Sequence, residues 1–146
     1  MAAERPAEQA GSRSDGAGLS TGGTSPLAGR RLYIPRMTYA GARLFAAACR
    51  SIGIDACLTP ESDARTLELG GLFSSGEECL PEKITLGDFL KVIKSPGFDP
   101  ARTAFFMPTA EGPCRFGQYA PYLRQVLHEL GCSEVMIVSP SSEDGY

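Results

Sequence analysis

The sequence has 146 residues, 42% of them hydrophobic, which suits one compact domain of ordinary size. Its net charge of -3, with no basic cluster on any segment, disfavours binding to nucleic acid or to an anionic membrane surface. No apolar run approaches the roughly 20 residues that span a bilayer, and the N-terminal region lacks the apolar stretch of a secretory signal, so a cytoplasmic protein is expected.

Residues 1–29 predict a disordered tail or an interdomain linker. This segment is rich in Ala, Gly, Ser and Pro, contains no aromatic residue and shows no sustained apolar periodicity. Such a composition cannot bury enough apolar surface to offset the entropy lost on ordering. From Arg31 the composition changes, and residues 31–146 are predicted to form the folded domain.

Beyond Arg31, short apolar runs alternate with amphipathic stretches, which predicts strands alternating with helices. The expected strands are 32–34, 54–58, 103–107 and 134–138. The expected helices are 39–52, 62–69, 81–93 and 116–130, with Gly70-Gly71 ending the second of them. The apolar face of the first helix is expected to consist of Leu44, Phe45, Ala48, Cys49 and Ile52.

The order of these elements predicts the fold class. A strand, a helix and a strand in close succession form a βαβ unit, and its right-handed crossover implies a parallel sheet. The whole succession indicates a three-layer α/β domain with a Rossmann-like (flavodoxin-like) parallel sheet of about four strands. Because such sheets usually continue with a covering helix and a fifth strand, the domain is expected to be incomplete at its C-terminus.

Five cysteines, an odd number in a chain without an export signal, argue against a disulfide scaffold. Cys49, Cys57 and Cys132 fit ordinary apolar packing positions. Cys79 and Cys114 differ, since each lies in a polar loop rich in Gly or Pro just before an expected helix. A helix N-terminus favours a thiolate and an anionic cluster held by thiolates, but packing remains an equal alternative for both residues.

Two arginines follow expected strands at the edge where open parallel sheets bind their ligands. Arg36 follows the first strand and Arg115 follows the third. A guanidinium at either position could meet an anion, although surface ion pairing is the ordinary role of such a residue.

Four segments occur along the chain in this order: RLYIPRMTYAGARLFAAACRSIGIDACLTP, GEECLPEKITLGDF, FFMPTAEGPCRFGQY and VMIVSPSSEDGY. Together they resemble the 2-hydroxyacyl-CoA dehydratase and benzoyl-CoA reductase family. More narrowly, they are similar to the dehydratase-like region of large acyl-CoA enzyme activase proteins, in which that region accompanies ATP-dependent activase modules. The resemblance covers residues 31–146.

The resemblance implies an iron-sulfur protein. In that family, cysteines of Rossmann-like domains hold a [4Fe-4S] or related cluster, and an ATP-hydrolysing activator delivers a low-potential electron to it. Cys79 matches the cysteine of the family's C-x-P-x-K segment, Cys114 matches the cysteine after the third strand, and a further ligand usually comes from a downstream domain. Arg36, Glu78 and Arg115 would shape the field around the cluster. An activase module and an acyl-CoA are the implied partners.

Two other functions remain open from the sequence. One is a non-catalytic interaction or electron-transfer scaffold within a larger multi-domain protein. The other is a flavodoxin-like nucleotide binder that holds flavin or CoA without a metal. Since the nucleotide-binding motifs of the activase are absent from the chain, it is expected neither to hydrolyse ATP nor to complete a reductive cycle alone.

Overall fold

A computed structural model of the chain describes residues 25–142. Within this range, four strands form one parallel sheet in the order β2-β1-β3-β4. The strands are β1 (Arg31–Ile34), β2 (Ala56–Leu58), β3 (Thr103–Phe106) and β4 (Met136–Val138). The α-helices are α1 (Tyr39–Ser51), α2 (Ala64–Leu72), α3 (Leu80–Ile93) and α4 (Tyr119–Glu129), and two short 3-10 helices are η1 (Pro100–Arg102) and η2 (Arg115–Gln118). The predicted α/β class with a four-stranded parallel sheet is confirmed.

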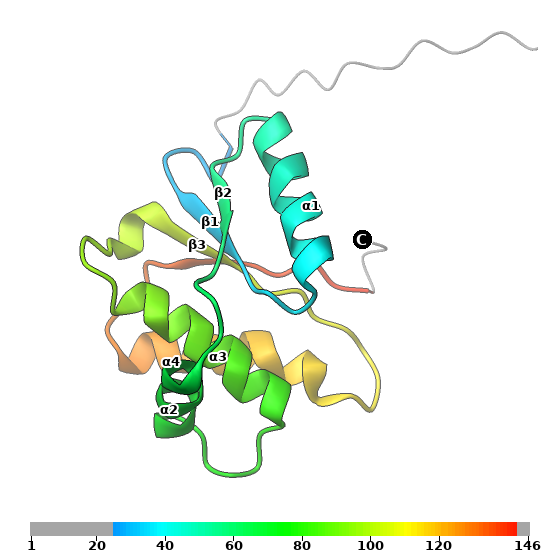
Figure 1. Cartoon of the computed structure of the whole chain (residues 1–146), viewed down its shortest axis with the longest axis vertical. Helices are drawn as coiled ribbons and strands as arrows, with labels where there is room; N and C mark the ends of the chain where they lie inside the picture. The colour runs from blue at the N-terminus through cyan, green and yellow to red at the C-terminus, as the bar shows by residue number, and fades with distance from the viewer. Residues whose placement is uncertain (1–24, 143–146) are drawn as a thin grey trace, which may run out of the picture.

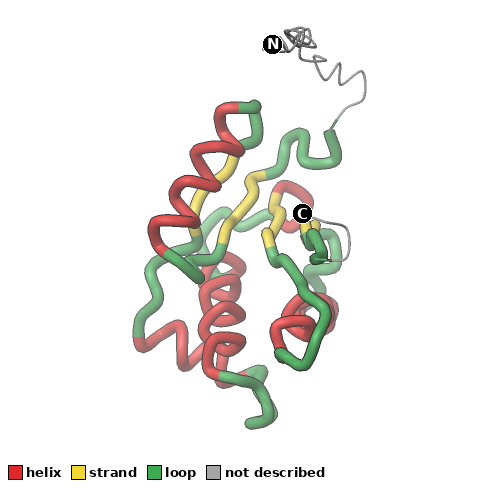
Figure 2. Tube along the Cα trace, turned by 90° about the vertical axis from the view of Figure 1, so that its right-hand side faces the viewer, coloured by secondary structure: helices red, strands yellow, loops and turns green. Residues whose placement is uncertain are grey.

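The helices cover the sheet unequally. Helix α1 lies on one face, against β1 and β2, whereas α2, α3 and α4 lie on the other (Figures 1 and 2). This follows from the strand order, because the chain moves outward from β1 to β2 and then returns past β1 to β3, and right-handed crossovers in opposite directions place helices on opposite faces. Each face has its own apolar core, the larger one centred on Phe89, Leu90 and Phe105.

Helix α1 packs through small side chains, not through the large ones expected. It buries Ala42, Ala46 and Cys49 against the sheet. Leu44 is 72% exposed and Ile52 is 75% exposed. The predicted apolar face is therefore correct at Cys49, correct in part at Phe45, whose ring lies 4.7 Å from that of Phe106, and wrong at Leu44, Ala48 and Ile52. Short side chains under the helix let its backbone lie close to the sheet, and this close fit leaves the longer ones outside.

The pair Gly70-Gly71 does not end α2, which continues to Leu72, so that prediction is also wrong. Gly70 lies against α3, where an added Cβ would overlap the Lys83 carbonyl oxygen. On α3, an added Cβ at Gly87 would overlap the Thr66 carbonyl oxygen of α2. The two glycines thus allow the backbones of α2 and α3 to touch at two places.

The folded part begins earlier than residue 31. Residues 1–24 of the expected tail lie outside the described residues, as do residues 143–146. Ser25 to Arg30 form turns, and Leu27 packs against the core beneath α1. Arg30 Nη1 donates to the carbonyl oxygens of Thr103 and Glu134, each at 3.0 Å, and so ties this segment to the ends of β3 and β4. Residues 25–29 of the expected tail are therefore part of the packed structure.

The contact between α2 and α3 predicts opposite effects for neighbouring glycines. Gly70→Ala and Gly87→Ala each place a methyl group onto a carbonyl oxygen of the facing helix, and each should lower the free energy of unfolding by about 1–3 kcal/mol. Gly71→Ala is the matched control, because nothing lies within 4 Å of its Cβ position, and it should leave stability unchanged or raise it by up to about 1 kcal/mol. Urea unfolding followed by circular dichroism measures all three, and equal effects at Gly70 and Gly71 would contradict the contact.

Candidate functional site

A cavity lies at the carboxyl edge of the sheet, where the chain turns in opposite directions after β1 and β3. It has a volume of about 380 Å³ and is formed by the loops after β1 and β2 together with α3, η2 and α4. This is the position at which open parallel sheets bind their ligands. Its lining residues are Arg36, Met37, Ser62, Leu80, Pro81, Ile84, Thr85, Asp88, Phe116 and Tyr119.

Arg36 occupies the edge that the sequence predicts for it. Its Nε donates to the Thr59 carbonyl oxygen at 2.8 Å, which orients the guanidinium. Its Nη1 makes only a 3.5 Å contact with Glu61 Oε1, and the Glu61 side chain is 83% exposed. The guanidinium also lies over the Tyr39 ring, 5.7 Å from its centroid. The Arg36 guanidinium is thus a positive charge with a fixed orientation in the wall of the cavity.

A buried aspartate forms another part of this wall. Asp88 is 2% exposed, and its Oδ2 accepts from Ser62 Oγ at 2.8 Å while its Oδ1 accepts from Thr66 Oγ1 at 2.9 Å. Burial raises the pKa of the Asp88 carboxyl, whereas the two hydroxyl donors and the charges of Lys91 and Arg36 oppose that rise. These bonds join the loop after β2, α2 and α3. The sequence did not single out Asp88, because its burial and its partners depend on how α2 and α3 pack.

Cys79 and Cys114 both lie near Tyr119. Cys79 is the N-cap residue of α3, and its Sγ is 2.9 Å from the Tyr119 hydroxyl oxygen. Cys114 is exposed and is the N-cap residue of η2. Burial raises the pKa of Tyr119, followed by the hydrogen bond with Cys79 and the charges of Cys79, Glu82 and Cys114. The structure therefore brings both thiols within electrostatic reach of one phenol.

The local structure at Cys114 differs from the prediction. An α-helix was expected from Phe116, but the four residues Arg115–Gln118 form a 3-10 helix and α4 begins at Tyr119. Gly117 lies close to the chain before it, since an added Cβ would be 2.8 Å from the Ala110 carbonyl oxygen. A single short 3-10 turn has only a small dipole, so the α-helix N-terminus expected just after Cys114 is absent there.

The other three cysteines match the packing role expected of them. Cys49 is buried under α1, and Cys57 and Cys132 are partly buried. Burial raises the pKa of the Cys49 thiol and of the Cys57 thiol, which keeps both protonated at neutral pH. Neither is suited to act as a thiolate.

Glu78 and Arg115 line a second, more open hollow of about 440 Å³. The Glu78 carboxylate accepts from the backbone N–H of Ser75 at 3.0 Å, from its hydroxyl at 2.9 Å and from the Gly76 N–H at 3.1 Å. These donors, the Ser75 backbone first, lower the pKa of Glu78 to about 2. The three residues expected around one cluster are thus divided, with Arg36 in the first cavity and Glu78 and Arg115 in the second hollow.

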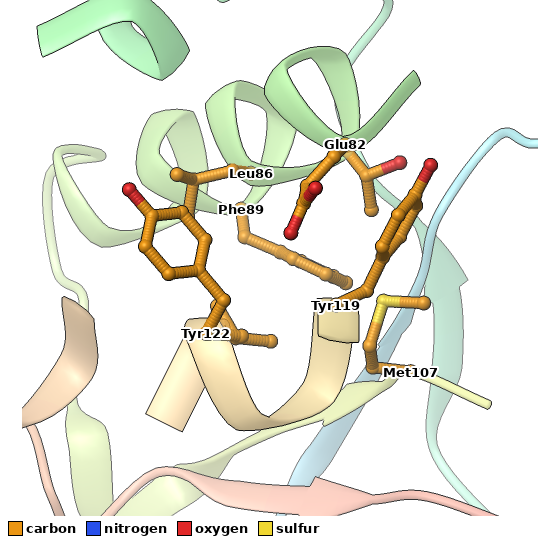
Figure 3. A pocket seen from close by; sticks show the side chains of 8 residues that line it. Glu82, Leu86, Phe89, Met107, Tyr119 and Tyr122 are labelled. Carbon is orange, nitrogen blue, oxygen red and sulfur yellow. The ribbon is translucent and has the colours of Figure 1, made fainter. Parts of the chain in front are cut away.

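A buried glutamate lies beside the second hollow, and no sequence pattern singled it out. Glu82 is 5% exposed and projects from α3 between Tyr119 and Tyr122 of α4 (Figure 3). It borders both the second hollow and a small cavity of about 10 Å³, which is about the least space that can hold one water molecule. Burial raises the pKa of Glu82, the charge of Glu78 raises it further, and Arg115 lowers it.

The donors at this edge match an iron-sulfur cluster in kind but not in number. Clusters of this type are held by thiolates, usually four, and two thiols are present here. Within residues 25–142, no group of three or more His, Cys, Asp or Glu side chains could hold a metal ion. A cluster at this edge would therefore need ligands beyond those described.

Within residues 25–142, no helix has the length and apolar character needed to cross a membrane.

Comparisons with known proteins give no relative for this chain. No protein-family model, no curated protein and no solved structure matches it. Function is therefore inferred from the motifs and from the geometry of this edge.

The buried carboxyl of Asp88 predicts a pH dependence of stability. Because its folded pKa lies above its unfolded value, the native state binds more protons between the two values. The stability that it contributes is fully present below the unfolded pKa, near 4, and is lost as the pH rises through the folded pKa. The free energy of unfolding of the wild type should therefore fall over this range relative to that of Asp88→Asn.

Ser62→Ala is the control variant for this titration. It removes a donor that favours the charged carboxylate, so the fall in stability should extend to higher pH. Urea unfolding at several pH values between about 4 and 8 measures the three proteins. If the free energies of unfolding of the wild type and Asp88→Asn changed with pH in parallel, the raised pKa of Asp88 would be contradicted.

Proposed function

We propose that this domain serves an acyl-CoA dehydratase- or reductase-type system, in which Cys79 and Cys114 are two thiolate ligands of an iron-sulfur cluster. The observation that carries the proposal is that both cysteines, which the motif order singles out, are N-cap residues of elements that line the cavity at the carboxyl edge of the sheet, where Cys79 also contacts Tyr119. The strand order β2-β1-β3-β4 matches the first four strands of a flavodoxin-like sheet, which supports a Rossmann-like domain.

Cys79 has the better defined surroundings of the two thiols. It lies at the N-terminus of a 14-residue helix, whose dipole favours a negatively charged sulfur. The Tyr119 hydroxyl, 2.9 Å from Sγ, is placed to donate a hydrogen bond to that sulfur. Pro81, in the first turn, has no N–H group that would be left without a partner there. When bound, the cluster would supply one-electron transfer at low potential.

The proposal requires a partner, because two thiols do not complete the usual ligand set. At least one further ligand would come from another domain or polypeptide, and an ATP-dependent activase would deliver the electron. The partner would approach the side of Cys114, because this thiol is exposed whereas Cys79 is partly buried. Arg115, next to Cys114, would then lie at the same surface and offset the negative charge of the thiolates.

Anaerobic incubation with iron and sulfide tests the thiolate assignment. With an excess of a small thiol to fill the missing ligand positions, the wild-type chain should develop a broad absorption at about 400 nm and bind iron, because thiolate-to-iron charge transfer gives such a band. Cys79→Ala and Cys114→Ala should each lose most of the absorption and the iron. Cys132→Ala is the matched control, since this thiol packs against the apolar core and its hydrogen bond goes to the Leu130 carbonyl oxygen, and it should behave as the wild type. Unchanged iron content in the Cys79→Ala/Cys114→Ala double variant would rule out the proposal.

The hydroxyl group beside Cys79 gives a second test that does not depend on losing the cluster. Tyr119→Phe keeps both thiols and should keep the iron content, but it removes the hydrogen bond to the Cys79 sulfur. Because hydrogen bonds to sulfur stabilise the reduced cluster, the reduction potential should become more negative. Redox titration of the reconstituted protein measures it. An unchanged potential would mean that Cys79 is not a ligand.

A further inference from the structure

The cavity beside Arg36 has the properties of a small-molecule site that the two thiols do not explain. Its volume of about 380 Å³ lies within the range of roughly 300–1,000 Å³ that is typical of ligand pockets. Most of its wall is apolar, and the apolar side chains are Met37, Leu80, Ile84 and Phe116. A few polar groups, chiefly Arg36, Ser62 and Asp88, interrupt this wall. An apolar wall with few polar groups suits a ligand that has an apolar body and one polar end.

Arg36 is the group in the cavity that is best able to hold the polar end. Its side chain is 22% exposed, and its Nε is fixed by the Thr59 carbonyl oxygen. Nη1 has only the long contact with the exposed Glu61, and Nη2 has no hydrogen-bond partner among residues 25–142. A surface pair of this kind contributes only about 0–1 kcal/mol, so Glu61 competes weakly. The terminal nitrogens therefore form a fork with donors to spare, which matches the two oxygens of a carboxylate or phosphate.

The negatively charged residues near Arg36 do not prevent its guanidinium from binding an anion. Asp88 is already engaged by the Ser62 and Thr66 hydroxyls, and Lys91 lies close enough to act on its charge. Glu61 points largely into solvent. In this cavity an anion can therefore bind the oriented Arg36 guanidinium, and the nearby Asp88 carboxyl already has its own hydrogen-bond donors.

We propose that this cavity binds a small molecule with a single oxyanion, a carboxylate or a phosphate monoester, on an apolar body. The Arg36 fork holds the oxyanion, and the body lies along Met37, Leu80, Ile84 and Phe116. This site does not rest on the iron-sulfur proposal, because none of its contacts involves Cys79 or Cys114.

Titration of the isotope-labelled full chain by NMR tests the site with three probes that share one apolar chain: hexanoate, hexyl phosphate and the neutral hexanamide. At least one of the two anions should bind about tenfold or more tightly than hexanamide, since a charged hydrogen bond is worth roughly 1.5–3 kcal/mol. Backbone signals that shift should belong to the cavity, including those of Met37, Ser62 and Ile84. Tighter binding of hexanoate assigns a carboxylic acid ligand, and tighter binding of hexyl phosphate assigns a phosphorylated one.

Variants of Arg36 complete the test. Arg36→Gln should bind the anions no more tightly than hexanamide, and Arg36→Lys, which keeps the charge but not the fork, should fall between it and the wild type. Arg65→Gln is the matched control, because Arg65 is exposed on α2 and pairs only with Glu68 at 2.7 Å. It should bind as the wild type does.

The proposal is overturned by any of three results: equal binding of the anions and hexanamide, shifts confined to residues outside the cavity, or anion binding unchanged in Arg36→Gln. If Arg36→Gln does not fold, Arg36→Lys and the map of shifted signals decide the question. All measurements are made without iron, so their outcome is separate from that of the cluster reconstitution.

Discussion

The direct contact between the backbones of α2 and α3 is the constraint on which the carboxyl edge of this domain depends. Gly70 lies against the Lys83 carbonyl and Gly87 lies against the Thr66 carbonyl. This proximity aligns Thr66 with Asp88, so that their side chains form a buried hydrogen bond of 2.9 Å. A larger residue at either glycine would separate the helices and break the hydrogen bond between the Thr66 hydroxyl and the Asp88 carboxylate. The domain would then lose stability, because buried polar groups without hydrogen-bond partners are unfavourable.

The same contact positions both loops that form the edge. Before α2, Asp63 caps the helix by accepting from the Thr66 N–H at 3.0 Å, and Lys91 of α3 pairs with Asp63 at 3.0 Å. The loop that contains Ser62 is therefore fixed relative to α3. After α2, the chain turns within a few residues and enters α3 at Cys79, where Glu78 stabilises the turn by accepting from Ser75 and Gly76. The packing of α2 against α3 therefore determines where both Ser62 and Cys79 lie.

Local sequence patterns predicted the strands, most of the helix positions and the parallel sheet, because hydrophobic periodicity depends on each element alone. Features that depend on a packing partner were not predicted. A glycine pair usually indicates the end of a helix. The role of Gly70, which is to allow the backbone of α3 to lie close to α2, can be recognised only when both helices are in place. The large side chains of α1 suggested its buried face, but the sheet beneath accepts Ala42 and Ala46, and Leu44 remains outside.

The candidate site was predictable to the same degree. Arg36 and Cys79 were found because they follow or precede predicted elements, so chain position alone places them at the edge. Asp88 and Glu82 lie within α3, and a helical pattern cannot distinguish a buried charge that has partners from one that faces solvent. Tyr119 is buried in α4, and its hydroxyl group contacts Cys79 across 40 residues of sequence, a contact that no local pattern encodes.

Tyr119 is also where the two proposed sites meet. Its side chain forms part of the cavity beside Arg36, and it borders the small cavity next to Glu82. Its hydroxyl group contacts the Cys79 sulfur at 2.9 Å. A molecule that fills the Arg36 cavity would therefore touch the side chain that holds this sulfur. Since a hydrogen bond to a thiolate depends on the position of its donor, occupation of the cavity and the electronic state of Cys79 are physically linked through one phenol ring.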